Sequence, residues 1–122
     1  MRVMIDLAEH KDDGYTPLKD VAERQEISKK YLEIIMRDLV DAKLVTAVSG
    51  KKGGYQLARE PEDYTLLAII ESAEGPLDPV ACLQADAEEC PRASFCKTLP
   101  LWKEYGQVTK DFFGSRTLAS LL

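Results

Sequence analysis

The feature that most constrains the fold of this chain is a change in apolar spacing between positions 16 and 58. Two segments with apolar residues three and four positions apart are joined by a tight turn, which predicts two consecutive helices. Thr16 is expected to cap the first helix, with Pro17 at its first position and its end near Arg24. Ser28 is expected to cap a longer helix that ends near Ala42. This arrangement indicates a helix-turn-helix.

The segment that follows switches to strand-like spacing. Two short apolar runs, 44–48 and 55–58, flank a stretch rich in glycine and lysine and predict a β-hairpin. Its tip carries Lys51 and Lys52, and Gly53 permits close approach to another surface. A basic hairpin directly after a helix-turn-helix is typical of a DNA-binding wing. Ordinary turn chemistry, with lysines that serve solubility, is the alternative.

Further helices are predicted on both sides of this unit. Apolar stripes predict one helix near positions 3–8 and another over 64–73. A longer helix follows, with an apolar and aromatic stripe at Leu99, Trp102, Tyr105, Val108 and Phe112. An uncovered stripe of this size favours aggregation, so we expect a second copy of the helix to cover it in a homodimer. Packing against the chain's own first helix is the alternative.

The predicted fold class is therefore mainly α with a small β-hairpin wing: a winged helix-turn-helix followed by a long C-terminal dimerisation helix. We divide the chain into a DNA-binding domain (1–75), a cysteine-containing loop (76–97) and a dimerisation helix with a C-terminal tail (98–122). A length of 122 residues allows one compact domain with a modest core.

Charge and hydropathy limit where the protein can be located in the cell and which partners it can bind. No apolar run approaches the ~18 residues that a membrane span needs, and the N-terminus lacks a secretory signal pattern, so we expect a cytoplasmic protein without a membrane partner. The net charge of −5 argues against nucleic acid. Between positions 27 and 59, however, the sequence has seven positively charged residues and only three negatively charged ones. This local excess of positive charge fits a DNA-binding surface, whereas a solvated face is the plainer explanation.

Within that basic region we predict the DNA contacts. The N-terminal turn of a recognition helix presents its side chains to base edges and phosphates, and wing lysines follow the adjacent minor groove or backbone. Tyr31 either joins these contacts or packs in the core. The predicted DNA-binding residues are Ser28, Lys29, Lys30, Tyr31, Lys51, Lys52 and Gly53.

Three cysteines, Cys82, Cys90 and Cys96, lie in one short stretch with the spacing C-x7-C-x5-C. A reducing cytosol and an odd number of thiols argue against a disulfide framework. Three thiolates this close in sequence can converge on one metal centre. Structural zinc sites favour paired knuckles with four protein ligands, so an iron–sulfur cluster is the preferred cofactor, as 2Fe-2S or 4Fe-4S, and it can be absent from the purified form.

These segments together resemble a known family. The runs 18–33, 39–45 and 53–59, with Leu101 and Trp102, are similar to the bacterial winged-helix regulators that include IscR, NsrR and CymR. The resemblance implies a homodimer that binds a palindromic operator on double-stranded DNA. In several members it also implies an iron–sulfur cluster held by three cysteines just before the dimerisation helix, which senses redox state, nitric oxide or iron–sulfur status.

The fourth cluster ligand departs from the family pattern. IscR-like members place a histidine three residues after the last cysteine, where this chain has Leu99, and NsrR-like members recruit a carboxylate near the start of the first helix. Solvent is one candidate for the fourth ligand here. The protein candidates are Asp6, Glu9, His10, Asp86, Glu88 and Glu89.

Two alternatives to a cluster sensor remain. A regulator of the same fold without a cluster would respond to thiol oxidation, a small ligand or a partner protein. A thiol enzyme or metal-delivery protein would use Cys96, whose thiol pKa could be lowered by Lys97 at a helix start. No second histidine or acid–base pair accompanies the cysteines, so we do not expect an enzyme.

For the cluster sensor itself, cluster occupancy or oxidation is expected to shift the two wings of the dimer and so change operator affinity.

Overall fold

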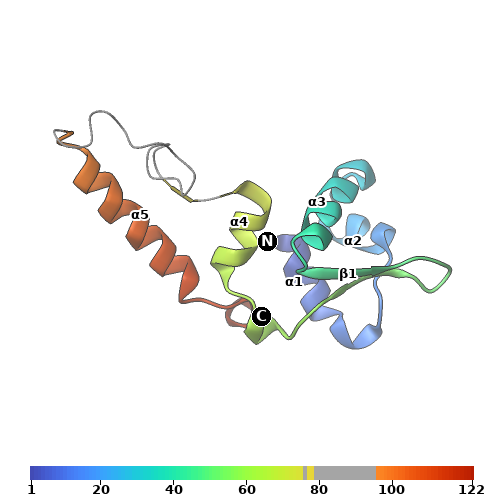
Figure 1. Ribbon diagram of the computed structural model, residues 1–122. Coiled ribbons are helices and arrows are strands. Elements are labelled where there is room, and N and C mark those ends of the chain that lie inside the picture. Colours follow the sequence, from blue (N-terminus) through green and yellow to red (C-terminus); the bar gives the residue numbers. More distant parts are fainter. Residues whose placement is uncertain (76, 79–95) are drawn as a thin grey trace.

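Five α-helices and one antiparallel β-hairpin are found in the residues that the computed structural model describes, 1–75, 77–78 and 96–122 (Figure 1). The elements in chain order are α1 (Arg2–Glu9), η1 (Lys11–Asp13), α2 (Leu18–Gln25), α3 (Lys29–Asp41), β1 (Val45–Val48), β2 (Gly54–Leu57), η2 (Pro61–Asp63), α4 (Leu66–Glu74), α5 (Leu99–Gly114) and η4 (Leu118–Leu121), where η marks a 3-10 helix. None of these helices combines the length and the apolar character needed to cross a bilayer.

The first three helices form the helix-turn-helix and share one core. Val21, Leu32 and Met36 are fully buried and place the inner faces of α2 and α3 together, with Met4 of α1 beneath them. The turn between α2 and α3 depends on Glu26, which adopts a left-handed conformation with φ 54°. Burying these apolar side chains is the main term that holds the three helices together.

Thr16 does not cap α2, contrary to the prediction. The N-cap position is Pro17, in extended conformation, and no side chain caps this helix. Thr16 instead pairs with Tyr55 of β2, and their backbone N–H groups each donate to the other's carbonyl oxygen at 2.8 Å. Gly54 permits this approach, because a Cβ at that position would lie 2.3 Å from the Thr16 carbonyl oxygen. The segment before α2 is therefore an edge partner of the wing.

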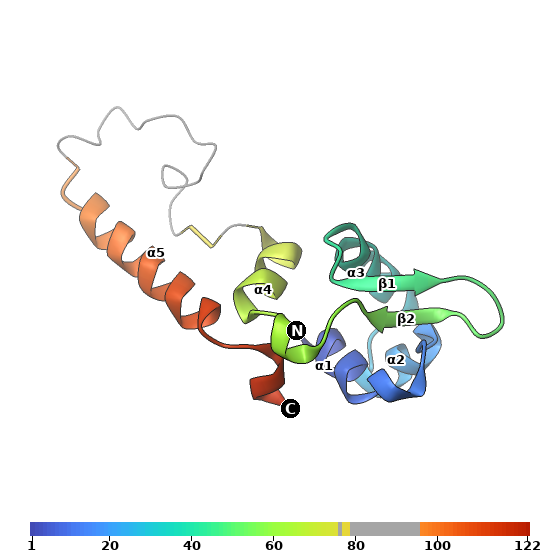
Figure 2. The same ribbon diagram turned by 60° about the horizontal axis from the view of Figure 1, so that its bottom comes forward.

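The hairpin projects from the helical body as a two-stranded wing (Figure 2). Val45 faces Leu57 at its base and Val48 faces Gly54 near its tip. The base is anchored in the core by Leu57, whereas the tip extends into solvent. A Cβ on Gly53 would lie 2.2 Å from the Val48 carbonyl oxygen, so the tight return of the strand requires glycine there.

The chain after α5 returns to the segment that joins η2 to α4, a contact that no sequence pattern signals. Leu118 of η4 is fully buried, and its N–H donates to the Tyr64 carbonyl oxygen at 3.0 Å. The Leu66 N–H donates to the Arg116 carbonyl oxygen at 2.9 Å. Tyr64 itself is buried, and its hydroxyl donates to the Leu44 carbonyl oxygen at 2.6 Å. In both views α5 lies on the far side of α4 from the helix-turn-helix (Figures 1 and 2).

Candidate DNA-binding surface and cysteine segment

The N-terminal turn of α3 is exposed and basic. Ser28 caps the helix, as predicted, because its Oγ accepts a hydrogen bond from the Tyr31 N–H at 3.2 Å. Lys29 and Lys30 lie in this first turn and are both exposed. Tyr31 is 59% exposed, so the alternative that it packs in the core is wrong. All four residues predicted to meet DNA from this helix therefore have surface positions.

The wing supplies the second basic group. Lys51 and Lys52 are exposed at the hairpin tip, next to Gly53, whose conformation closes the turn. The tip borders the loop that contains Tyr15 and Pro17, with which the two lysines share a surface depression. This depression lies at the end of the wing farthest from the core, where an extended phosphate backbone can approach the lysines.

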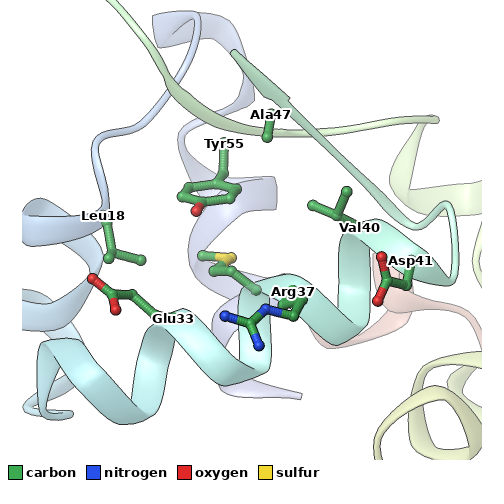
Figure 3. A pocket seen from close by; sticks show the side chains of 8 residues that line it. Leu18, Glu33, Arg37, Val40, Asp41, Ala47 and Tyr55 are labelled. Carbon is green, nitrogen blue, oxygen red and sulfur yellow. The ribbon is translucent and has the colours of Figure 1, made fainter. Parts of the chain in front are cut away.

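A groove of about 410 Å³ separates α3 from the hairpin (Figure 3). Fully buried Met36 forms part of its floor. Tyr55 of β2 faces the groove from the wing side. Glu33, Arg37 and Asp41 follow one another along α3 at four-residue intervals on its edge. A molecule bound here would contact the helix and the wing together. No sequence pattern signals this groove, because its residues come from four separate elements.

A buried ion pair fixes α1 against α2. Asp6 of α1 is 1% exposed, and both of its carboxylate oxygens accept hydrogen bonds from Arg24, at 2.7 and 3.0 Å. Gln25 Nε2 donates to the same carboxylate at 2.9 Å. Burial alone would raise the pKa of Asp6, but the hydrogen bonds from Arg24 and Gln25 outweigh it and hold that pKa below its ordinary value. The carboxylate thus stays charged and orients α2.

This pair bears on the search for a fourth cluster ligand. Asp6 already has three hydrogen bonds in a closed site, which makes it a poor metal ligand. His10 is half-buried at the end of α1, and its Nδ1 donates to the Asp6 carbonyl oxygen at 2.8 Å. Glu9 is exposed. The candidates Asp86, Glu88 and Glu89 lie outside the described residues.

Cys96 closes the cysteine segment three residues before α5. It is half-buried, and its Sγ lies 3.3 Å from the Thr98 Oγ1. Cys82 and Cys90 lie outside the described residues, and among the residues that are described no group of three or more His, Cys, Asp or Glu could hold a metal ion. Three thiols are a donor set that suits an iron–sulfur cluster, and the one that is described lies at the surface, next to a helix start.

A second ion pair links the start of the cysteine segment to α5. The Asp78 carboxylate lies 2.7 Å from the Lys110 Nζ, and its side chain is 7% exposed. The hydrogen bond to Asp78 raises the pKa of Lys110 above its ordinary value. The two residues are 32 positions apart, so no sequence pattern signals their contact.

The outer face of α5 carries a continuous apolar stripe. Its members are spaced four, three and four residues apart, which places them on one side of a helix. Trp102 flanks the stripe and meets the Tyr105 ring edge-on, with ring centroids 6.2 Å apart. The stripe residues, each about half exposed or more, are Leu101 (58%), Tyr105 (55%), Val108 (62%) and Phe112 (49%).

Comparison with known proteins identifies the family. The family model Rrf2, described as an iron-dependent transcriptional regulator, matches residues 1–122. The chain belongs to the Rrf2 family. This assignment confirms the resemblance found in the sequence and makes the protein a transcriptional regulator of the IscR and CymR type.

Individual relatives support the assignment along the whole Rrf2 chain. Protein rrf2 of Nitratidesulfovibrio vulgaris is 37% identical over 99% of this chain and 80% of its own length. The regulator IscR of Yersinia pseudotuberculosis is 34% identical over 98% of this chain and 71% of its own. The Yersinia relative is an HTH-type transcriptional regulator by name, which agrees with the expectation that this Rrf2 protein acts on transcription.

Solved structures show the same fold. CymR of B. subtilis, described as that organism's global cysteine regulator, matches with a TM-score of 0.78 and 36% identity, over 98% of this chain and 87% of CymR. IscR of T. potens matches with a TM-score of 0.77 and 37% identity, over 98% of this chain and 77% of IscR. The predicted fold class, mainly helical with a small hairpin wing and a long C-terminal helix, is confirmed.

Proposed function

We propose that this Rrf2 regulator is a homodimer that binds a palindromic DNA operator and senses redox state, nitric oxide or iron–sulfur status through a cluster held by Cys82, Cys90 and Cys96. The observation that carries the proposal is the position of the cysteine segment. It connects α4, which packs on α3 of the DNA-binding unit (α1–α3 and the wing), to α5, whose apolar face is exposed. A change in this segment can therefore alter how two DNA-binding units are held relative to each other.

The exposed basic residues on α3 and the wing support the DNA contacts. Ser28, Lys29, Lys30 and Tyr31 are proposed to enter the major groove, and Lys51, Lys52 and Gly53 to follow the adjacent backbone or minor groove. In a symmetric dimer each contact occurs twice, once in each half-site, so the operator is expected to be palindromic.

Replacing Lys29 and Lys30 by alanine is expected to lower operator affinity about 100-fold. Four lysines are lost from each dimer, and about 0.7 kcal/mol for each exposed contact gives this factor. The slope of log affinity against log salt concentration should also become shallower, by about 3.6. Fluorescence anisotropy measures both quantities on a DNA duplex. The duplex is first selected from a random pool, in parallel selections with the cluster-loaded and the cluster-free protein.

The matched control replaces Lys97 and Lys103 by alanine. These exposed lysines flank the start of α5, outside the winged unit, and their loss changes the net charge by the same amount. Equal losses of affinity in the two double variants would mean that general charge, rather than the first turn of α3, governs binding.

The cysteines are proposed to hold the cluster. An iron–sulfur cluster supplies reversible electron exchange and reactivity towards oxidants and nitric oxide. The chain's own part is to provide three thiolates, with Cys96 fixed at the start of α5 and Cys82 close after Asp78. The description of the matching family as iron-dependent supports this assignment. The fourth ligand is left to solvent, His10 or a carboxylate other than Asp6.

Serine at position 90 is expected to abolish the cluster. One thiolate fewer leaves too few ligands, so anaerobically purified Cys90→Ser protein should lose its visible absorption, iron and sulfide while keeping the wild-type far-UV circular dichroism. Its operator affinity should match that of cluster-free wild type and should not respond to air. A variant with wild-type iron content, or one that still responds to air, contradicts the proposed site.

A second candidate keeps the fold and the operator but replaces the cluster by a small ligand. The groove between α3 and the wing favours it, because about 410 Å³ with an apolar floor and charged edge is within the range of ligand sites. Iron and sulfide analysis separates the two candidates. Anaerobic wild-type protein without iron or sulfide, which binds the selected duplex with an affinity insensitive to air, would favour the groove.

A further inference from the structure

The start of the cysteine segment is held on α5 by the Asp78–Lys110 ion pair. The Asp78 side chain is nearly buried at 7% exposure, and its carboxylate lies 2.7 Å from the Lys110 ammonium. Lys110 is 37% exposed, and Glu71 of α4 adds to the negative field around it. Because the Asp78 side chain is nearly buried, solvent screens this contact less than it screens an ordinary surface ion pair.

The local backbone brings these two residues together. α4 ends at Glu74, and Gly75 follows with φ 80°, a conformation that turns the chain and favours glycine. Three residues later, Asp78 reaches α5 beyond its midpoint. Lys110 lies about 200° around the helix from Val108, so the pair occupies the face of α5 opposite the apolar stripe. The stripe stays exposed while the opposite face holds Asp78.

The same arrangement attaches both ends of the cysteine segment to one helix. Cys96 leads directly into the N-terminus of α5, whereas Asp78 is fixed near Lys110, about three turns further along. The inner face of α5 packs on α4, with Gly106 buried one turn before Lys110. α4 in turn packs on α3, the helix proposed to enter the major groove.

We propose that the Asp78–Lys110 pair transmits the state of the cysteine segment from α5 to α4 and the DNA-binding unit. This inference rests on the proposed cluster-sensing function, because it names the contact that couples the cluster to the operator. With the pair formed, a shift of the segment moves the end of α4 together with α5. With the pair broken, the start of the segment moves alone, and the DNA-binding unit no longer follows. Both would act as positioning residues, through their contact with each other, rather than as metal ligands or DNA contacts.

The test compares, between variants, how strongly the cluster changes operator affinity, rather than operator affinity alone. For each variant, the dissociation constant for the selected duplex is measured anaerobically with cluster-loaded and with cluster-free protein. For wild type the ratio should lie in the range of about 5–150-fold that is typical of coupled sites. In Asp78→Asn and Lys110→Met it should fall to about 1, with iron content unchanged. The exchanged pair Asp78→Lys/Lys110→Asp should recover most of the wild-type ratio, and Lys103→Met, on the same face two turns away, should keep it.

Hydrogen exchange of the cluster-free protein gives a second readout that does not depend on the cluster. The Gly75 N–H donates to the Glu71 carbonyl oxygen at 2.9 Å at the end of α4. This amide should exchange faster in Asp78→Asn and Lys110→Met, and at the wild-type rate in the exchanged pair and in Lys103→Met.

Each outcome bears on the inference. If the two dissociation constants of wild type are equal, a ratio of 1, the proposed cluster sensing is wrong, and so is the transmitting role of the pair. A wild-type ratio above 5 that persists in both single variants overturns the role of the pair and leaves cluster sensing intact. Loss of iron from both single variants would show that the pair serves cluster assembly, which also overturns transmission.

Discussion

Aspartate at position 108 is expected to give a folded monomer whose operator affinity is at least about 100-fold weaker than that of wild type. Val108 is 62% exposed at the centre of the α5 stripe, so the substitution leaves the core of the single chain intact. In the proposed dimer it buries two carboxylates close together in an apolar contact, which is strongly unfavourable. A monomer engages one half-site at a time and loses the gain of simultaneous binding, typically 10²–10⁴-fold.

Sedimentation velocity and circular dichroism check this result separately for assembly and for folding. The single tryptophan of the chain, Trp102, flanks the stripe beside Tyr105 and offers a third readout. Its fluorescence should shift to longer wavelength when the interface is lost, because the ring becomes more hydrated. The wild-type protein should sediment as a dimer.

Lys103→Met is the matched control for Val108→Asp. It also lowers the net charge by one and lies on α5, but outside the stripe. This variant should remain dimeric with wild-type operator affinity. A Val108→Asp protein that still sediments as a dimer would show that another surface joins the two chains, and the assignment of the stripe would then be wrong.

The secondary structure was predictable because local spacing dominates it. The apolar positions of α3 and α5 recur at helical intervals, and Ser28 marks the start of α3, so both helices were placed within a few residues. The wing was predicted from its glycines and from the change to strand spacing. In each case the signal lies within a single element.

Contacts between distant segments escaped prediction for the same reason. Thr16 has the residue type and position of an N-cap, but pairing with Tyr55 satisfies its backbone and overrides the local preference. Leu118 lies in a short tail without helical periodicity, yet it fills the core beside Tyr64. Asp78 and Lys110 meet only because Gly75 turns the chain onto α5.

The candidate DNA-binding residues could be chosen from the sequence, and only the exposure of Tyr31 could not be predicted. Lys29, Lys30, Lys51 and Lys52 are long charged side chains, which are seldom buried, so their surface positions were expected. Tyr31 was undecided because tyrosine suits both a core and an interface. Its exposure follows from the rotation of α3, which is set by Leu32 and Met36 in the core.

Asparagine at position 6 is expected to lower the free energy of unfolding by about 2–3 kcal/mol. Removing one partner of a buried pair costs about 3–5 kcal/mol, and the 35% exposure of Arg24 reduces this loss because water can solvate its guanidinium. The melting temperature should fall by about 10 °C for a chain of this size. Glu60→Gln makes the same carboxyl-to-amide change in the exposed Lys11–Glu60 pair, and it should leave the melting temperature almost unchanged.

The pH dependence of this difference separates loss of the Asp6 charge from a change of packing. The pKa of Asp6 is lowered in the folded protein from an ordinary value of 3.8, so the folded state binds its proton less readily than the unfolded state. The stabilisation is therefore complete well above pH 3.8 and is lost as the pH falls through the lowered pKa. Urea unfolding of wild type and Asp6→Asn should show a constant difference from pH 7 to about pH 5, which narrows at lower pH. A difference that stays constant down to pH 2 would show that packing, rather than the carboxylate charge, makes the asparagine variant less stable.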